Sequence, residues 1–361
     1  MLFYPLPTTH YSLCLLFYPL PTTHYSLSWI ITGVAILLSL PAGAALLLVG
    51  LYLYLCWNHL EHLSRIFLEK PLFIIPRGQP LPEAEEVALR TPDALTLRGC
   101  YVKTTAPSRK GVILFGLEFG SNRWACGPYT DFLRDAGYDV FTYEPRCQGE
   151  SDCEKGFEPL QWVTDREAAD CRTALEYLKG RPDADPRGVG LFGYSKGANA
   201  GLVVAAGDRF IRCAVTDGAF GHHTVMVPYM RVWFAIYDPN YPLHGLFGAW
   251  YYGLIARTGV RRLERERGTR FPDVETALRK FGPRPVLMIH GADDTYIKAD
   301  MARALFRYAR PPKELWIVPN AKHNQAIQVA GDEYRRRVRE FFDRHLAEGS
   351  PRRHGEHGEK P

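Results

Sequence analysis

The pattern of hydrophobic and polar positions divides the chain into an apolar N-terminal part and a longer mixed part. Residues 1–60 contain no Asp, Glu, Lys or Arg, and the stretch from Trp29 to Trp57 is almost continuously apolar. A helix needs about 20 apolar residues to cross a bilayer, so this stretch is long enough to cross with some tilt. The pattern therefore predicts a transmembrane helix over residues 29–57, with Pro41 as a candidate kink.

A secretory signal peptide is the competing interpretation of the same stretch. It requires a positively charged start and a shorter apolar core, and the sequence has neither. Arg65, Lys70 and Arg77 follow the predicted span, whereas no Lys or Arg precedes it. Because positive residues concentrate on the cytoplasmic side, we expect a single-pass membrane protein whose main domain faces the cytoplasm.

The segment before the span, residues 1–28, is a duplication rich in Pro, Thr and Tyr. Residues 2–13 read LFYPLPTTHYSL, and residues 16–27 repeat them without change. Two copies are too few to build a repeat fold. A recent DNA repeat or a misassigned start is the favoured explanation, with a short luminal recognition segment as the remoter one.

After a linker over residues 58–86, apolar runs alternate with helical periodicity from residue 87 to residue 345. Residues 87–90 and 95–102 predict an opening antiparallel pair around the turn at 91–93. Further strands are predicted at 112–115, 140–143, 189–192, 211–216, 285–289 and 314–318, and helices at 129–135, 163–179, 196–206, 299–308 and 332–345. This alternation predicts an α/β fold with a mostly parallel, doubly wound sheet flanked by helices. Residues 346–361 are polar and predict a disordered tail.

One connection is too long for a plain crossover between parallel strands. Roughly 65 residues separate the strand at 211–216 from the strand at 285–289, where a few loop residues and one helix are usual. The first half of this connection holds far more aromatic residues than the chain average of 13%. We expect a cap over about residues 219–282, with over half of its rings packed on the sheet and the rest lining an apolar pocket.

The sequence Gly193-Tyr194-Ser195-Lys196-Gly197 stands between a predicted strand and a predicted helix. Glycines at both ends allow the strand and helix to approach closely, which leaves the serine on a sharp turn with its hydroxyl exposed. A serine hydroxyl is a nucleophile only when it is presented in this way and a base takes its proton. The pattern indicates Ser195 as the nucleophile of a serine hydrolase.

Two later loops supply the partners that such a serine needs. The strand at 285–289 leads into Asp293 and Asp294, and the strand at 314–318 leads into a loop with His323. Ligands bind at the carboxyl ends of strands in open α/β sheets. The chain order Ser, Asp, His is the order of the α/β-hydrolase architecture.

The stretch from about Val87 to His345 resembles an α/β-hydrolase domain of the serine-aminopeptidase-like group. The family's Gly-x-Ser-x-Gly pattern falls on residues 193–197, its His-Gly-x-x-Asp pattern on residues 290–294, and its terminal histidine on His323. The resemblance implies Ser195 as nucleophile, His323 as base and Asp294 as the carboxylate that orients the imidazole. Asp293 is the rival carboxylate, but it stands one residue early in that pattern.

The oxyanion of the reaction needs two donors. The backbone N–H of Lys196 is expected to be one, because it follows the nucleophile at a helix N-terminus. The other is expected from the loop after residues 112–115, where many relatives have His-Gly and this chain has Leu117-Glu118-Phe119. Phe119 is preferred and Leu117 is the alternative. Glu118 must point away or pair, either with Lys196 or with solvent.

Composition adds limits on partners and compartment. The net charge of +5 comes from interspersed Lys/Arg and Asp/Glu, so nucleic acid is not an expected partner. The run Arg261 to Arg267 reads as a solvated helix face that can also touch anionic lipid heads. The chain has eight cysteines without a Cys-x-x-Cys pair, which is typical of a reduced intracellular protein, although Cys147 and Cys153 can pair if the domain is exported. No cofactor, metal or oligomeric state is indicated.

The sequence as a whole favours a membrane-anchored serine hydrolase that cleaves esters or thioesters of small-molecule or lipid acyl substrates. Tyr194, Phe220 and Trp233 are the candidates for its substrate pocket. Peptide hydrolysis of the aminopeptidase kind is a second hypothesis, although the cap has few acidic residues to bind an N-terminal amine. A non-catalytic binding protein that keeps the hydrolase fold is a third.

Overall fold

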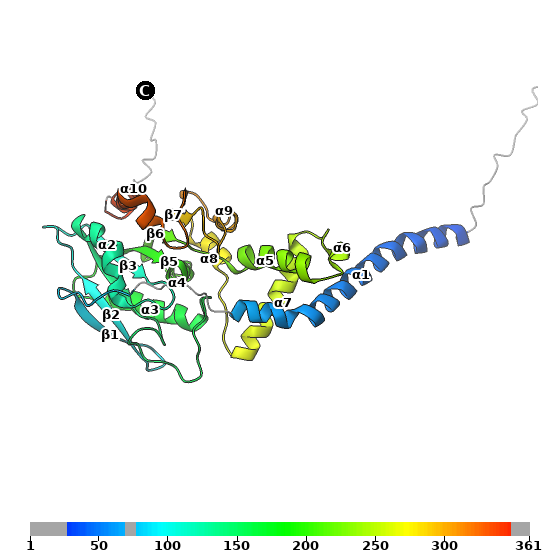
Figure 1. Cartoon of the computed structure of the whole chain (residues 1–361), viewed down its shortest axis with the longest axis horizontal. Helices are drawn as coiled ribbons and strands as arrows, with labels where there is room; N and C mark the ends of the chain where they lie inside the picture. The colour runs from blue at the N-terminus through cyan, green and yellow to red at the C-terminus, as the bar shows by residue number, and fades with distance from the viewer. Residues whose placement is uncertain (1–26, 69–76, 348–361) are drawn as a thin grey trace, which may run out of the picture. The chain divides into compact units, whose positions relative to one another are not determined.

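The computed structural model describes residues 27–68 and 77–347 of the chain (Figure 1). The duplication at the N-terminus therefore falls outside the described residues, apart from its last two, and so does most of the predicted tail. The chain forms two compact units, one up to Tyr54 and one from Leu55 onward.

The N-terminal helix is longer than the sequence pattern predicts. Helix α1 runs over Leu27–Leu68, so the first part of the predicted linker at 58–86 is helical. Within it, Ser28–Arg65 contains a stretch of 18 residues with a mean hydropathy of 2.4, and this is the one helix in the described residues that is long and apolar enough to cross a membrane. Length and hydropathy alone suit a signal sequence equally well.

The last turns of α1 differ from its apolar part because one side of them is buried. Leu55, Leu60, Leu63 and Phe67 are at most 6% exposed and recur at helical spacing. The Phe67 ring stacks on Trp162 at a centroid distance of 4.5 Å. This segment therefore packs as an ordinary amphipathic helix of the second unit.

The second unit is built on one sheet of eight strands in the order β1-β2-β4-β3-β5-β6-β7-β8. The strands are β1 (Glu85–Arg90), β2 (Thr96–Val102), β3 (Gly111–Gly116), β4 (Tyr138–Tyr143), β5 (Val189–Tyr194), β6 (Ile211–Asp217), β7 (Val286–Gly291) and β8 (Lys313–Val318). The β1–β2 and β2–β4 pairs are antiparallel, and all other pairs are parallel. The predicted mostly parallel α/β sheet, with an antiparallel pair at its start, is confirmed.

Helices cover both faces of this sheet. The non-cap helices after α1 are α2 (Cys126–Asp135), α3 (Asp165–Gly180), α4 (Ser195–Ala205), α9 (Ala299–Phe306) and α10 (Ala326–Phe342), with short helical turns η1 (Arg123–Ala125) and η2 (Asp343–Ala347). One hydrophobic cluster lies between the sheet and α3 and α4, and a second lies between the sheet and α2 and α10 (Figure 1). The central strands β3 and β5 are buried along their whole length, as strands covered on both faces must be.

Two boundaries near the C-terminus differ from the sequence prediction. Helix α10 begins with a helical segment that the sequence did not predict: Gly331, with a positive φ of 50°, divides Ala326–Phe342 by a kink, and the part after the kink begins near the predicted residue 332. Leu346 belongs to the predicted tail, yet it is only 3% exposed and packs in the second hydrophobic cluster. The ordered domain thus continues through Ala347.

The predicted cap is helical. It consists of α5 (His222–Tyr237), α6 (Tyr241–His244), α7 (Ala249–Arg267) and α8 (Val274–Phe281). Helices α5 and α7 lie side by side (Figure 1). Of the aromatic residues in and just before it, Phe220, Phe234, Tyr251 and Tyr252 are buried, whereas Tyr237 and Trp250 are exposed. The expected packing of more than half of the rings on the sheet stays a prediction.

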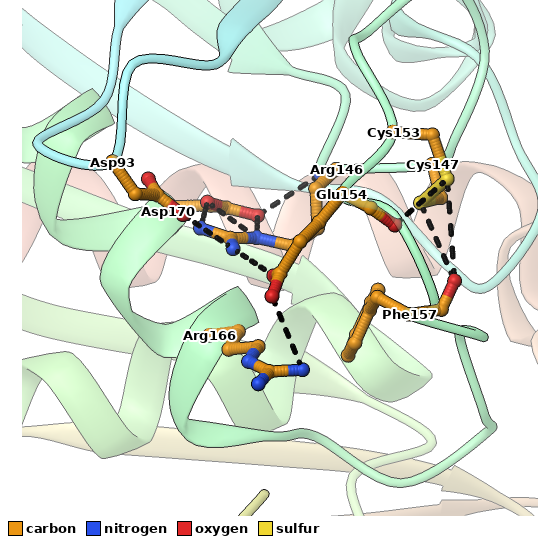
Figure 2. The surroundings of a disulfide bond; sticks show 8 residues. All are labelled: Asp93, Arg146, Cys147, Cys153, Glu154, Phe157, Arg166 and Asp170. Atoms are coloured by element: carbon orange, nitrogen blue, oxygen red, sulfur yellow. Dashed lines mark hydrogen bonds and ion pairs between the residues drawn. A yellow bond between two sulfur atoms is a disulfide. The ribbon is translucent and has the colours of Figure 1, made fainter. Parts of the chain in front are cut away.

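The loop after β4 is stabilised by a disulfide bond and by ion pairs. Cys147 and Cys153 form a disulfide with a Cα–Cα distance of 4.1 Å. Beside them, Arg146 is 2% exposed and pairs with Asp93, Glu154 and Asp170 (Figure 2). Because Asp170 lies in α3 and Asp93 in the β1–β2 turn, this arginine ties the loop to both elements.

Candidate active site

Ser195 is the first residue of α4 and follows the last residue of β5 directly. Its φ of 47° lies in the left-handed region, which a non-glycine residue adopts only where the surroundings impose it. The sharp strand-to-helix turn predicted for the Gly-x-Ser-x-Gly motif is thus present. Ser195 is 6% exposed, so little of this residue is in contact with solvent.

The two glycines of the motif are required by close backbone contacts. A Cβ on Gly197 would lie 2.3 Å from the carbonyl carbon of Gly116 at the end of β3. A Cβ on Gly193 would lie 2.6 Å from the Cα of Ala198. Both contacts are shorter than real Cβ atoms tolerate, so no other residue fits here without moving α4 away from the sheet.

The structure brings Ser195, His323 and Asp294 together. The Ser195 Oγ is 3.0 Å from the His323 Nε2, and the His323 Nδ1 is 2.6 Å from the Asp294 Oδ2. His323 follows β8, and Asp294 follows β7. With Nδ1 donating to the carboxylate, Nε2 is the acceptor that can take the serine proton.

Asp294 is held in its ionised form by its surroundings. Its Oδ1 accepts the backbone N–H groups of Tyr296 and Ile297 at 2.8 and 2.9 Å. Burial acts to raise the pKa of Asp294, but the hydrogen bond and charge of His323 outweigh it, and the net pKa lies below the usual value. The neighbouring Asp293 is exposed, and its backbone N–H donates to the Ala321 carbonyl.

Lys196, the residue after the nucleophile, has a buried side chain. Its Nζ donates to the Leu160 carbonyl and to the Glu167 carboxylate, and it lies 5.0 Å from the centre of the Phe119 ring. Burial lowers the pKa of Lys196, with the Glu167 charge acting against it. The ion pair between Lys196 and Glu167 connects the first turn of α4 with the first turn of α3.

Glu118 takes neither of the positions expected from the sequence. It is 5% exposed, and its carboxylate accepts the Asn324 amide at 2.7 Å and the Tyr129 hydroxyl at 3.3 Å. The expected pairing with Lys196 is wrong because Lys196 is already paired with Glu167. Burial raises the pKa of Glu118 despite these hydrogen bonds. Glu118 connects the loop after β3 with the loop that carries His323.

Hydrogen bonds from the disulfide-linked loop also fix the loop over residues 117–122. The Gln148 amide donates to the carbonyls of Glu118 and Ser121 at 3.1 and 2.9 Å. In the part of the chain that the structure describes, the backbone N–H groups of Leu117 and Phe119 donate no hydrogen bond. Their roles as oxyanion donors, like that of the Lys196 N–H, stay predictions.

The three candidate pocket residues lie in different surroundings. Tyr194 is 1% exposed within the core, and its hydroxyl is 2.7 Å from that of Tyr334. Phe220 packs edge-on against Trp162 at 5.3 Å. Trp233 contacts the rings of His59 and His62 in the last turns of α1. Their contribution to a pocket is untested, and Tyr194 is a core residue.

Sequence reasoning missed Asp217, which ends β6 at the same edge of the sheet as the three site residues. It is fully buried, and its Oδ2 accepts the Tyr334 hydroxyl at 3.0 Å while its Oδ1 has no partner in the described residues. Burial raises its pKa to about 7. Its position directly after a predicted strand was the signal available in the sequence.

Among the described residues no group of three or more His, Cys, Asp or Glu side chains is arranged to hold a metal ion. The chemistry that the arrangement offers is acyl transfer to a serine. It needs only the hydroxyl, the imidazole and the carboxylate already in hydrogen-bond contact.

The chain is also similar in sequence to a known family and to known proteins. The profile described as "Alpha/beta hydrolase family" matches residues 117–337, which is more than half of the chain. The uncharacterized protein YfhR of Escherichia coli K12 is 26% identical over 265 residues, covering 72% of this chain and 80% of that protein. The polyketide transferase ATR5 of Stachybotrys chlorohalonatus is 26% identical over 299 residues, covering 73% of this chain and 97% of its own.

Solved structures share the fold at low sequence identity. The esterase Pf2001 of Pyrococcus furiosus superposes with a TM-score of 0.56 at 22% identity, covering 77% of this chain and 100% of that chain. The alpha/beta hydrolase GrgF of a Penicillium species gives a TM-score of 0.54 at 20% identity, with coverages of 74% and 100%. Both likenesses concern the fold.

Proposed function

Because the chain belongs to the alpha/beta hydrolase family, we propose that it is a serine hydrolase in which Ser195, His323 and Asp294 form the catalytic triad. The observation that supports this most directly is the continuous hydrogen-bond path of 3.0 and 2.6 Å from the Ser195 hydroxyl through His323 to Asp294. The order of the residues along the chain, and the positive φ at Ser195, support the same proposal.

The proposed reaction is the hydrolysis of a carboxylic ester or thioester in two halves. The Ser195 Oγ attacks the carbonyl carbon while His323 Nε2 takes its proton, and the oxyanion accepts the backbone N–H of Lys196 and of Phe119 or Leu117. His323 then gives its proton to the leaving alcohol or thiol as the bond to the carbonyl carbon breaks. Water, deprotonated by His323, attacks the acyl-enzyme, and the acid and Ser195 are released.

We propose apolar acyl groups as substrates because the cap is rich in aromatic and aliphatic side chains. We also propose that α1 anchors the protein in a membrane, which would bring lipid acyl esters within reach. The apolar segment of α1 supports this anchor, because 18 consecutive residues in it have a mean hydropathy of 2.4 and its side chains are exposed. The Lys and Arg residues after the segment support a cytoplasmic catalytic domain.

A fluorophosphonate probe tests the nucleophile, because it reacts only with an activated serine. We expect labelling of the full chain and none of the Ser195→Ala variant, with Asp293→Asn as a control that still labels. Labelling that persists in Ser195→Ala, or that is absent from the wild type, would refute the proposed catalytic serine and favour a non-catalytic binding role.

Substrate class is tested separately with p-nitrophenyl esters of increasing chain length, their thioester analogues and aminoacyl anilides. We expect kcat/KM to rise with acyl length and the anilides to react least. The reverse order, with anilides as the best substrates, would replace the esterase proposal by a peptidase.

A further inference from the structure

The cap carries an exposed apolar surface at the end where α5 meets α7. We call this surface the cap tip. Its members are exposed by 44% to 91%, and they are Val232, Ile236, Tyr237, Leu243, Leu246, Trp250 and Leu254. Single exposed apolar residues are ordinary on protein surfaces, whereas a group that recurs along α5, α6 and the start of α7 indicates an interaction site.

The cap tip is also free of exposed charge. Asp238 is the one charged residue between Val232 and Ala256. It is 4% exposed, and its Oδ2 accepts from the Nε2 of both His59 and His244 at 2.9 Å. The exposed side chains from Val232 to Leu254 are therefore mostly apolar or aromatic, and Arg231, directly before Val232, is an exposed cation at their border.

Helix α7 changes character along a single face. Trp250 and Leu254 are followed at helical spacing by Arg257, Arg261 and Arg265, which fall on the same side of the helix. These arginines are exposed. At 1.5 Å per residue, Arg257 stands about 10 Å along the axis from Trp250. An apolar start followed by arginines one to two turns later matches the change from acyl chains to anionic headgroups across a membrane interface.

The chain itself brings a membrane to this surface. The segment after Leu55 packs against the cap, since His59 bonds to Asp238 and the Trp233 ring lies 5.2 and 5.8 Å from the rings of His59 and His62. The same helix continues backwards, through a direct peptide link, into the apolar segment proposed as the anchor. Because the proposed anchor ends only a few residues before His59, the length of the chain alone keeps the cap close to any bilayer that holds the anchor.

We propose that the cap tip inserts into the interface of an anionic membrane, with its apolar side chains among the acyl chains and the α7 arginines at the headgroups. This inference rests on the proposed membrane anchor. It deepens the proposed function, because α5 is joined to the loop that carries Asp294. The Tyr229 hydroxyl donates to the Tyr296 carbonyl at 2.5 Å. Insertion of the tip therefore acts on a helix that is hydrogen-bonded to the loop carrying Asp294.

The test places a polarity-sensitive NBD fluorophore on the full chain in phosphatidylcholine–phosphatidylglycerol vesicles. Leu246→Cys carries the label, in a background in which Cys14, Cys56, Cys147 and Cys153 are replaced by serine, since the free cysteines that remain are buried. Val329→Cys on α10 is the matched control, because Val329 is 46% exposed and lies outside the cap. Lipids that bear a nitroxide quencher in the upper acyl chain report insertion.

We expect blue-shifted emission and strong quenching at position 246 and neither at position 329, with weaker quenching when phosphatidylglycerol is omitted. Equal quenching at the two positions would overturn the proposal. A blue shift at 246 that nitroxide lipids do not quench, and that grows with the protein-to-lipid ratio, would also overturn it in favour of a second copy of the chain. The measurement works equally in Ser195→Ala, so its failure is distinct from failure of the proposed catalysis.

A second variant pair links the surface to substrate delivery. Leu246→Asp should lower hydrolysis of a vesicle-embedded acyl ester by about tenfold or more, from the lost burial of one leucine, while hydrolysis of soluble p-nitrophenyl acetate is unchanged. Val329→Asp should leave both rates unchanged. Equal rates for Leu246→Asp and wild type on the embedded ester would count against insertion.

Discussion

Asp293 and Asp294 are neighbours in the chain with opposite surroundings. Asp294 is 4% exposed and bonded to His323, whereas Asp293 is exposed. We expect Asp294→Asn to lower kcat by about 10⁴-fold, because an amide NH₂ facing Nδ1 favours the wrong imidazole tautomer. Asp293→Asn should stay within about twofold of wild type. Steady-state kinetics on a p-nitrophenyl ester checks both, and equal losses in the two variants would contradict the assignment.

Asp217 predicts a pH dependence of stability. Its pKa is about 7 in the folded protein and 3.8 for a free carboxyl, so between these pH values the folded state holds a proton that the unfolded chain releases. The stabilisation is therefore complete below the lower pKa and is lost as the pH rises through the upper one, by an amount on the order of 4 kcal/mol.

Asp217→Asn removes that dependence, since an amide does not ionise and still accepts the Tyr334 hydroxyl. We expect the stability of the variant, relative to wild type, to increase by a few kcal/mol from pH 4 to pH 8. Thermal unfolding of the full chain in detergent across this range measures it. A constant difference between the two proteins, like that expected for Asp293→Asn, would show that Asp217 is ionised throughout.

Single residues also show what could be predicted from the sequence at this site. Ser195, Asp294 and His323 each follow a recognisable apolar strand, so their convergence at one sheet edge could be foreseen from strand order. The partners of Glu118 could not, because Tyr129 and Asn324 reach it from separate elements through side-chain packing. Spacing along the chain carries no signal for such contacts.

The buried pair of Lys196 and Glu167 joins two elements, α4 and α3, next to the nucleophile. Removing one partner leaves an unpaired buried charge, so Lys196→Met or Glu167→Met should lower the free energy of unfolding by about 3–5 kcal/mol. The double variant Lys196→Met with Glu167→Met should recover a large part of the loss. Urea unfolding followed by tryptophan fluorescence gives the double-mutant cycle, and additive losses would mean that the two side chains do not interact.

Elements were predictable where one physical pattern dominates. The core strands are short apolar runs and lie within a few residues of their predicted bounds. The end of α1 could not be predicted in this way. After residue 54 the helix changes from apolar on all sides to apolar on one side, and the first polar residues there resemble a linker. The cap helices gave no clear period, since aromatic residues occupy both their buried and their exposed faces.

At the scale of the whole molecule, two features favour opposite sides of the membrane for the catalytic domain. Arg65, Lys70 and Arg77 follow the apolar segment, which favours the cytoplasm. The bond between Cys147 and Cys153 favours an oxidising compartment, because cytosolic thiols are kept reduced. The sequence left this pairing conditional on export, and the structure forms it. The redox state of these two cysteines in cells therefore reports the orientation.

If the domain faces the cytoplasm as proposed, Cys147 and Cys153 are thiols in the cell. Thiols trapped by acid and then alkylated after denaturation with a maleimide polymer should give the same mass shift with and without prior reduction. A variant with both cysteines replaced by serine should show a shift smaller by two polymers under either condition. Four thiols buried in the fold, Cys100, Cys126, Cys171 and Cys213, serve as the internal standard for complete alkylation. If two more polymers are attached only after reduction, the disulfide exists in cells. The catalytic domain would then lie on the exported side of the membrane, because this disulfide persists only in an oxidising environment.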